Sequence, residues 1–180
     1  IETKKYYIYH ILDKCLNFVK DFAHSNNLIL VGGQSLDYAF RLKGKKLYED
    51  WQLPDYDFLS DDNVNVAYLL FEKVNKFMFG RALDEPQQIP ISVISGLHST
   101  TIKVLIYRDS IADITYVPKE IYEMYKISAL AYNNMLIRHP FLQCIDMQRS
   151  LSYPYENPMM EVILFRWKKD FDRFKMILDI

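Results

Sequence analysis

The sequence has few of the residues that hold disulfide-rich or zinc-binding domains together. Among 180 residues it contains 2 cysteines, Cys15 and Cys144, and neither belongs to a CxxC pair. The 4 histidines are scattered along the chain. A disulfide framework and a zinc site are therefore disfavoured, and this cysteine usage fits a reducing compartment such as the cytoplasm.

Long apolar runs and an excess of one charge are also missing. No apolar run approaches the roughly 20 residues that a membrane-spanning helix needs, so we expect no membrane association. With 22 basic and 23 acidic residues, the formal net charge is −1, which argues against a broad electropositive surface. If RNA binds, we expect a local groove. The first residue is Ile1, without signal-peptide features, so we expect a fragment of a longer protein.

Apolar residues make up 50% of the chain, enough for the core of one domain. Their spacing predicts helices and strands in alternation, followed by helices from residue 119 onward. Ser35 is the expected N-cap of the second helix. The expected helices cover residues 8–23, 35–41, 67–78, 119–133, 141–150 and 158–180, and the expected strands cover 28–31, 55–59, 91–94, 102–107 and 111–117.

This order predicts an α+β fold in which helices flank a mixed β-sheet and a helical segment follows. We expect residues 1–118 to form the core. Residues 119–180 would pack on this core or begin a second domain.

Two acidic residues stand two apart at the start of an expected strand, in the segment Asp55-Tyr56-Asp57. Residues at this spacing point to the same side of a strand, so both carboxylates would project together. Like charges this close favour a neutralising cation, and Mg²⁺ prefers carboxylate and phosphate oxygens. A solvated strand end is the simpler interpretation of this pair alone.

The segment Gly32-Gly33-Gln34-Ser35 lies between an expected strand and an expected helix. Glycine lets the backbone approach a ligand closely, and a helix N-terminus offers N–H groups to an anion such as a triphosphate. The residues match neither GxxxxGK[ST] nor GxGxxG, which excludes a P-loop and a dinucleotide fingerprint. An ordinary tight turn is the alternative.

Asp113 stands inside a segment of strand-forming residues, where an aspartate is unfavourable unless a partner or a metal neutralises it. A glycine turn, an acidic pair and one further acid together form the set that two-metal nucleotidyl transfer requires. Asp55, Asp57 and Asp113 would hold Mg²⁺ or Mn²⁺. Gly32, Gly33, Gln34 and Ser35 would hold the β- and γ-phosphates.

This constellation resembles the DNA polymerase β-like nucleotidyltransferases and, more narrowly, the poly(A) polymerase catalytic subunits of large cytoplasmic DNA viruses. The family's commoner turn is Gly-Gly-Ser or Gly-Ser, whereas Gln34 intervenes here, which leaves the role of Ser35 open. The segments that carry the resemblance, besides the glycine turn, are 53–58, 98–104, 112–118, 139–141, 146–149 and 152–154.

The resemblance implies a nucleotidyltransferase fold, dependence on Mg²⁺ or Mn²⁺, ATP as substrate and an RNA 3′ end as primer. It also implies the host cytoplasm or the virion as location, and it allows a homodimer or a partner subunit. A tRNA end or a small molecule is an alternative acceptor. A non-catalytic scaffold subunit is the rival class, although all three aspartates are present.

Basic and aromatic residues elsewhere carry weaker signals. Lys168, Lys169 and Arg173 on the last expected helix could line an RNA path, but an exposed amphipathic face is the simpler interpretation. Tyr38, Tyr48 and Tyr56 could stack on bases, yet packing is the default in a chain with 14 tyrosines.

Overall fold

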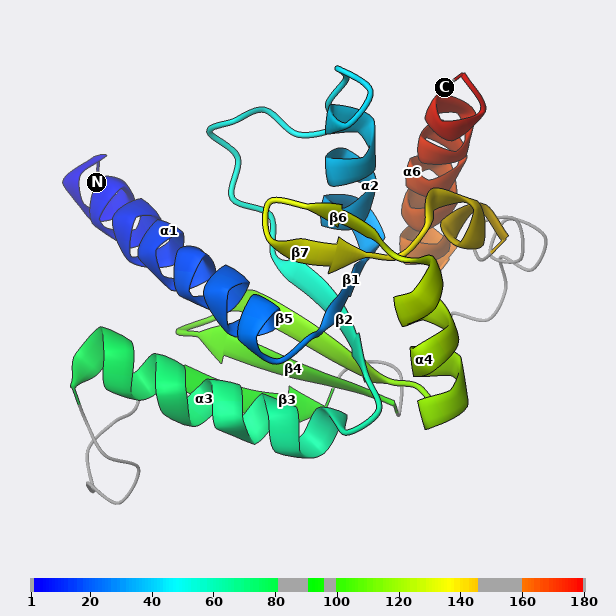
Figure 1. Ribbon diagram of the computed structural model, residues 1–180. Helices are drawn as coiled ribbons and strands as arrows, with labels where there is room; N and C mark the ends of the chain where they lie inside the picture. The colour runs from blue at the N-terminus through cyan, green and yellow to red at the C-terminus, as the bar shows by residue number, and fades with distance from the viewer. Residues whose placement is uncertain (1, 81–90, 96–99, 146–159, 180) are drawn as a thin grey trace.

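The computed structural model describes residues 2–80, 91–95, 100–145 and 160–179. In these residues a seven-stranded sheet forms the centre of the molecule, with the order β3-β4-β5-β2-β1-β7-β6 (Figure 1). The strands are β1 (Ile29–Val31), β2 (Tyr56–Ser60), β3 (Ile91–Ser95), β4 (Thr101–Ile106), β5 (Asp109–Tyr116), β6 (Leu130–Tyr132) and β7 (Met135–Ile137). The helices are α1 (Glu2–Ser25), α2 (Gly32–Arg41), α3 (Asn63–Phe79), α4 (Lys119–Ser128) and α6 (Met160–Leu178), with a short helical stretch at 140–145.

The sheet is mixed, which confirms the expected fold class. Strand β2 pairs antiparallel with β1 and parallel with β5. Strand β1 pairs parallel with β7. Because β1, β2 and β5 are neighbours, residues from three distant parts of the sequence meet at the centre of the sheet.

The two faces of the sheet are covered by different helices. Leu30 and Phe58 belong to the main apolar core, which includes residues of α1 and α3. Ile29 and Leu59 alternate with them along β1 and β2 and pack against Tyr122 of α4 on the other face. Asp57 is two residues before Leu59, so its side chain lies on the α4 face, away from the main core.

Helix α6 lies alongside α2 (Figure 1). Ile177 of α6 packs against Leu36 and Phe40 of α2 in a second apolar cluster. This contact brings the C-terminal helix next to the helix that begins at the glycine turn.

The expectation of a continuous helix over residues 119–133 was wrong. Helix α4 ends at Ser128, and the hairpin of β6 and β7 follows. Asn133 and Asn134 make its turn with φ values of 53° and 60°, a conformation that asparagine tolerates well. The described part of residues 119–180 therefore adds two strands to the sheet, while the domain boundary at residue 118 stays a prediction.

The expected cap of α2 was also wrong. The helix begins at Gly32, three residues before Ser35, and its N-cap is Val31, which makes no side-chain capping bond. The end of the helix expected at 141–150 and the start of the helix expected at 158–180 lie outside the described residues. Among the described helices, none has the length and apolarity needed to cross a bilayer.

Candidate active site

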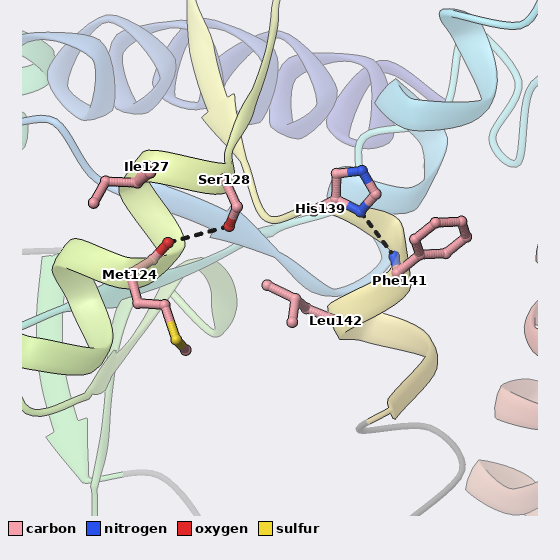
Figure 2. A pocket seen from close by; sticks show the side chains of 6 residues that line it. All are labelled: Met124, Ile127, Ser128, His139, Phe141 and Leu142. Atoms are coloured by element: carbon pink, nitrogen blue, oxygen red, sulfur yellow. Dashed lines mark hydrogen bonds between the residues drawn. The ribbon is translucent and has the colours of Figure 1, made fainter.

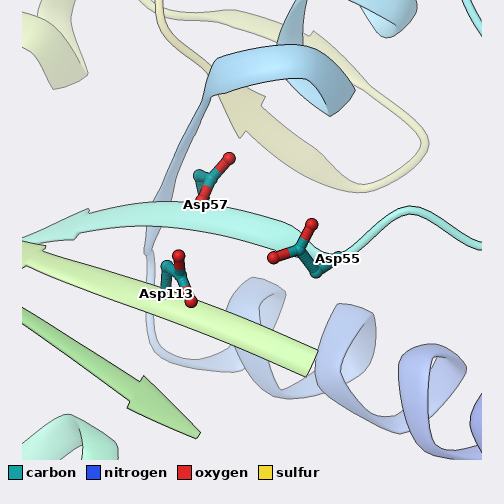
Figure 3. Close-up of side chains that lie close together, drawn as sticks. All are labelled: Asp55, Asp57 and Asp113. Atoms are coloured by element: carbon teal, nitrogen blue, oxygen red, sulfur yellow. The ribbon is translucent and has the colours of Figure 1, made fainter. Parts of the chain in front are cut away.

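The structure brings Asp55, Asp57 and Asp113 together. Parallel pairing of β2 with β5 places Asp57 opposite Asp113, and Asp55 stands just before β2. Each of the three aspartates offers one ligand oxygen, and these atoms all lie within 4.8 Å of one another (Figure 3). Three carboxylates at this separation form a donor set that suits a hard divalent cation.

The electrostatics of this triad favour a bound cation. Burial, followed by the charges of Asp55 and Asp113, raises the pKa of the Asp57 carboxyl to about 7, against the opposing effects of Lys103 and Lys169. Burial and the charge of Asp113 also raise the pKa of Asp55. Crowded carboxylates with raised pKa values are a common feature of functional sites.

Lys103 and Ser110 hold the Asp113 side chain. Lys103 Nζ donates to Asp113 Oδ2 at 2.8 Å, and Ser110 Oγ donates to Asp113 Oδ1 at 2.8 Å. Neither residue was predicted from the sequence. Lys103 lies directly opposite Asp113 in the β4–β5 pair, next to a register shift between Val104 and Leu105. The pairing of these strands was the signal that could have identified Lys103.

Gly32 connects the end of β1 to the triad. Its φ is +73°, and a Cβ atom at this position would collide with Oδ2 of Asp57. Both observations require glycine here. The first-turn N–H groups of α2 have no intrahelical acceptor, and Val31 supplies no side-chain acceptor either. The glycine turn therefore places a helix N-terminus beside the aspartates, as an anion site would require.

The side chains of Gln34 and Ser35 bond to other parts of the protein, which the sequence did not predict. Both side chains are buried. Gln34 Nε2 donates to the Pro54 carbonyl at 3.4 Å, whereas Ser35 Oγ accepts from Gln143 Nε2 at 2.6 Å. The Ser35 hydroxyl keeps its own proton for donation. Its contact with phosphate stays a prediction.

Tyr48 and Arg173 lie against Gly33. A Cβ atom on Gly33 would collide with the Tyr48 hydroxyl and would lie 3.0 Å from Arg173 Nη2. Arg173 Nη2 donates to the Tyr48 hydroxyl at 2.9 Å. Burial raises the pKa of Tyr48, while Arg173 opposes this shift. The C-terminal helix thus reaches the glycine turn.

The structure contains an apolar cavity and a polar cavity in addition to the triad. An apolar cavity of about 410 Å³ lies between α4 and residues 139–142 (Figure 2). Its His139 Nδ1 accepts from the Phe141 N–H at 3.2 Å, and it contains no acidic residue. A polar cavity of about 210 Å³ is lined by residues that include Gln34, Tyr48 and Pro54, the residue before Asp55. None of the three aspartates lines either of these two cavities, so the candidate active site is defined by the triad and the Gly32 turn beside it.

Comparisons with known proteins place this geometry in a class. The chain is similar to the crystal structure of the Megavirus polyadenylate synthase, with a TM-score of 0.78 and 21% identity over 95% of this chain and 32% of that one. The match shows that the chain has a nucleotidyltransferase fold.

The sequence comparisons give the family. Residues 17–157 match the model of the poly(A) polymerase catalytic subunit family, and the chain belongs to this family. Proteins of African swine fever virus isolates from Kenya and Malawi, provisionally named poly(A) polymerase catalytic subunits, are each 31% identical over 170 residues. These matches cover 92% of this chain and 33% of each relative, so the chain spans about a third of their length.

Proposed function

We propose that this chain carries the nucleotidyl-transfer site of a poly(A) polymerase, which adds AMP from ATP to RNA 3′ ends. The observation that carries the proposal is the convergence of Asp55, Asp57 and Asp113 beside the Gly32 turn in a member of this family. A scaffold subunit would have no reason to keep three crowded carboxylates at such an electrostatic cost.

In the proposed reaction the primer 3′-oxygen forms a bond to the α-phosphorus of ATP. The bond between the α-phosphorus and the bridging oxygen to the β-phosphate breaks, and pyrophosphate leaves. Mg²⁺ or Mn²⁺ held by the three aspartates would make the 3′-hydroxyl more acidic and would neutralise charge on the pyrophosphate. The role of the protein is to orient both substrates, with the Gly32–Gly33 backbone approaching the phosphates.

The name of the viral relatives describes a catalytic subunit, which supports a partner subunit for this chain as well. A homodimer is the alternative, and the mass of the purified complex distinguishes the two. Both cysteines are free thiols, which is compatible with the reducing host cytoplasm that we propose as the place of action.

The test is primer extension with a short RNA, each of the four nucleoside triphosphates separately, and Mg²⁺ or Mn²⁺. Variants Asp55→Ala, Asp57→Ala and Asp113→Ala are compared with Asp61→Ala, which changes an exposed aspartate just after β2. Tails from ATP alone, lost in the three triad variants and kept in the control, are expected.

Extension of a tRNA end or modification of a small molecule, with no poly(A) tail on other RNA, would replace the proposed acceptor but keep the chemistry. A folded protein that shows neither metal-dependent ATP binding nor extension would instead support the scaffold.

A further inference from the structure

One face of α6 continues from the apolar contact with α2 toward the aspartates. Ile177 packs on α2, Arg173 is four residues earlier, and Lys169 is four residues before that. Residues at this spacing share one side of a helix. The helix therefore presents, in order, an apolar anchor and two cations along the side that faces the glycine turn.

The Arg173 guanidinium is held next to the first turn of α2. Its Nη2 donates to the Tyr48 hydroxyl, and both groups occupy the space that a Gly33 side chain would fill. Among the described residues, no carboxylate pairs with this guanidinium. Arginine has five N–H donors, so donors remain for an anionic ligand after the bond to a neutral hydroxyl.

Lys169 and Tyr48 both interact electrostatically with aspartates of the triad. The positive charge of Lys169 lowers the pKa of Asp57, and the pKa of Tyr48 responds to both Asp55 and Asp57. The geometry of the two glycines gives the same neighbourhood, because a Cβ atom on Gly32 would meet Asp57 Oδ2 and one on the adjacent Gly33 would lie 3.0 Å from Arg173 Nη2. A polyphosphate bound through metal to carboxylates needs positive charge on its other side.

We propose that Arg173 and Lys169, with Tyr48 positioning Arg173, bind the β- and γ-phosphates of the incoming nucleoside triphosphate opposite the three aspartates. This inference rests on the proposed nucleotidyl transfer. It assigns a substrate-binding role to a helix that is about 115 residues beyond the acidic pair in sequence. The location beside the glycine turn favours the triphosphate over an RNA backbone as the ligand of this face.

The experiment measures equilibrium binding of α,β-methylene-ATP, which cannot react, and of AMP, each with Mg²⁺. Variants Arg173→Gln and Lys169→Gln are compared with Lys168→Gln, an equal loss of charge at an exposed neighbouring position on the same helix. Arg173→Lys provides a conservative variant in case Arg173→Gln fails to fold. Binding of Mn²⁺ alone, followed by electron paramagnetic resonance, reports on the aspartates independently.

We expect Arg173→Gln to weaken binding of the triphosphate analogue roughly ten- to hundred-fold, and Lys169→Gln by roughly three- to tenfold. AMP binding and Mn²⁺ binding should change less than about twofold, because neither involves the β- and γ-phosphates. Lys168→Gln should behave like the parent.

Three results would overturn the inference while leaving the proposed function in place. In the first, Arg173→Gln and Lys169→Gln bind the analogue as tightly as the parent does. In the second, the variants lose affinity for the analogue and for AMP equally. In the third, they lose affinity for an RNA oligonucleotide but bind the analogue unchanged. A parent protein that binds neither Mn²⁺ nor the analogue would overturn the proposed function, and the inference with it.

Discussion

Two acidic groups close to the start of α2 have opposite environments. Asp37 is 3% exposed and accepts three bonds, from Arg41 Nε at 2.7 Å, the Leu47 N–H at 2.8 Å and the Tyr48 N–H at 2.9 Å. Asp57 lies among two other carboxylates, and no donor among the described residues bonds to it. The protein satisfies the first acid with three hydrogen bonds, whereas the second is one of the carboxylates for which we propose a bound cation.

The difference shows how burial alone misleads about function. A buried charge is tolerated when it is paired and hydrogen-bonded, as Asp37 is, and its role is then structural. At Asp57 the fold keeps a group whose pKa is raised to about 7 and supplies no compensating bond. Such an unfavourable arrangement is expected where metal binding provides the missing compensation. Asp37 also fixes the backbone of Tyr48, so the structural acid supports the functional region.

The largest expected effect is the loss of catalysis in Asp57→Asn. Primer extension should fall at least roughly a thousand-fold, because the variant loses a proposed metal-binding carboxylate. The metal-free protein should be more stable than the parent at pH 8, by about 1–2 kcal/mol, because a partly buried charge with a raised pKa is removed. Denaturant unfolding with EDTA measures the stability. A strongly destabilised Asp57→Asn would show that the carboxylate is structural, like that of Asp37.

The reverse outcome is expected for Asp37→Asn. An amide offers one acceptor oxygen in place of two and no charge to Arg41, so the variant should lose about 2–4 kcal/mol of unfolding free energy. Primer extension below the melting transition should fall far less than in Asp57→Asn, and Mn²⁺ binding should be retained. A stable Asp37→Asn with abolished Mn²⁺ binding would remove the distinction between the two acids.

Much of the triad could be read from the sequence because its members follow simple periodicities. Asp55 and Asp57 share a face through the two-residue repeat of a strand, and Asp113 stands out among strand-forming residues. Their meeting depends on the parallel pairing of β2 with β5, which the local sequence does not predict. The mixed sheet with flanking helices was predicted correctly because its helices and strands also follow simple periodicities of apolar residues.

The missed features depend on long-range contacts. Lys103 was overlooked because its role follows from the β4–β5 register. The β6–β7 hairpin was overlooked because apolar residues around it also fit helical spacing, while the Asn133–Asn134 turn signal was not used. Ser35 looked like a helix cap, but α2 begins three residues earlier, at Gly32 beside Asp57. Arg173 and Tyr48 meet across 125 residues of sequence.

The pH dependence of metal binding is expected to be intermediate in size. Folding raises the pKa of Asp57 from 3.8 to about 7. The protonated group therefore contributes to the stability of the metal-free fold below pH 4, and this contribution is lost as the pH rises to about 7. Metal binding requires the ionised form, so Mn²⁺ affinity should fall about tenfold per pH unit below 7 and level off above it. Titrations at pH 6, 7 and 8 test this. The same slope in Asp57→Asn would assign the proton to another group.

The smallest effect is expected for Lys103→Met. Lys103 Nζ bonds to an oxygen of Asp113 that a metal would also use, so it partly compensates the triad in the absence of metal. Its removal should make the metal-free protein melt at a lower temperature and make Mn²⁺ bind roughly three- to fivefold more tightly. Lys103→Arg, which keeps the charge, should stay near the parent in both measurements. Weaker Mn²⁺ binding by Lys103→Met would instead show that the lysine orients Asp113 for the metal. Asp113 would then resemble Asp37, because the protein itself would hold its carboxylate in place.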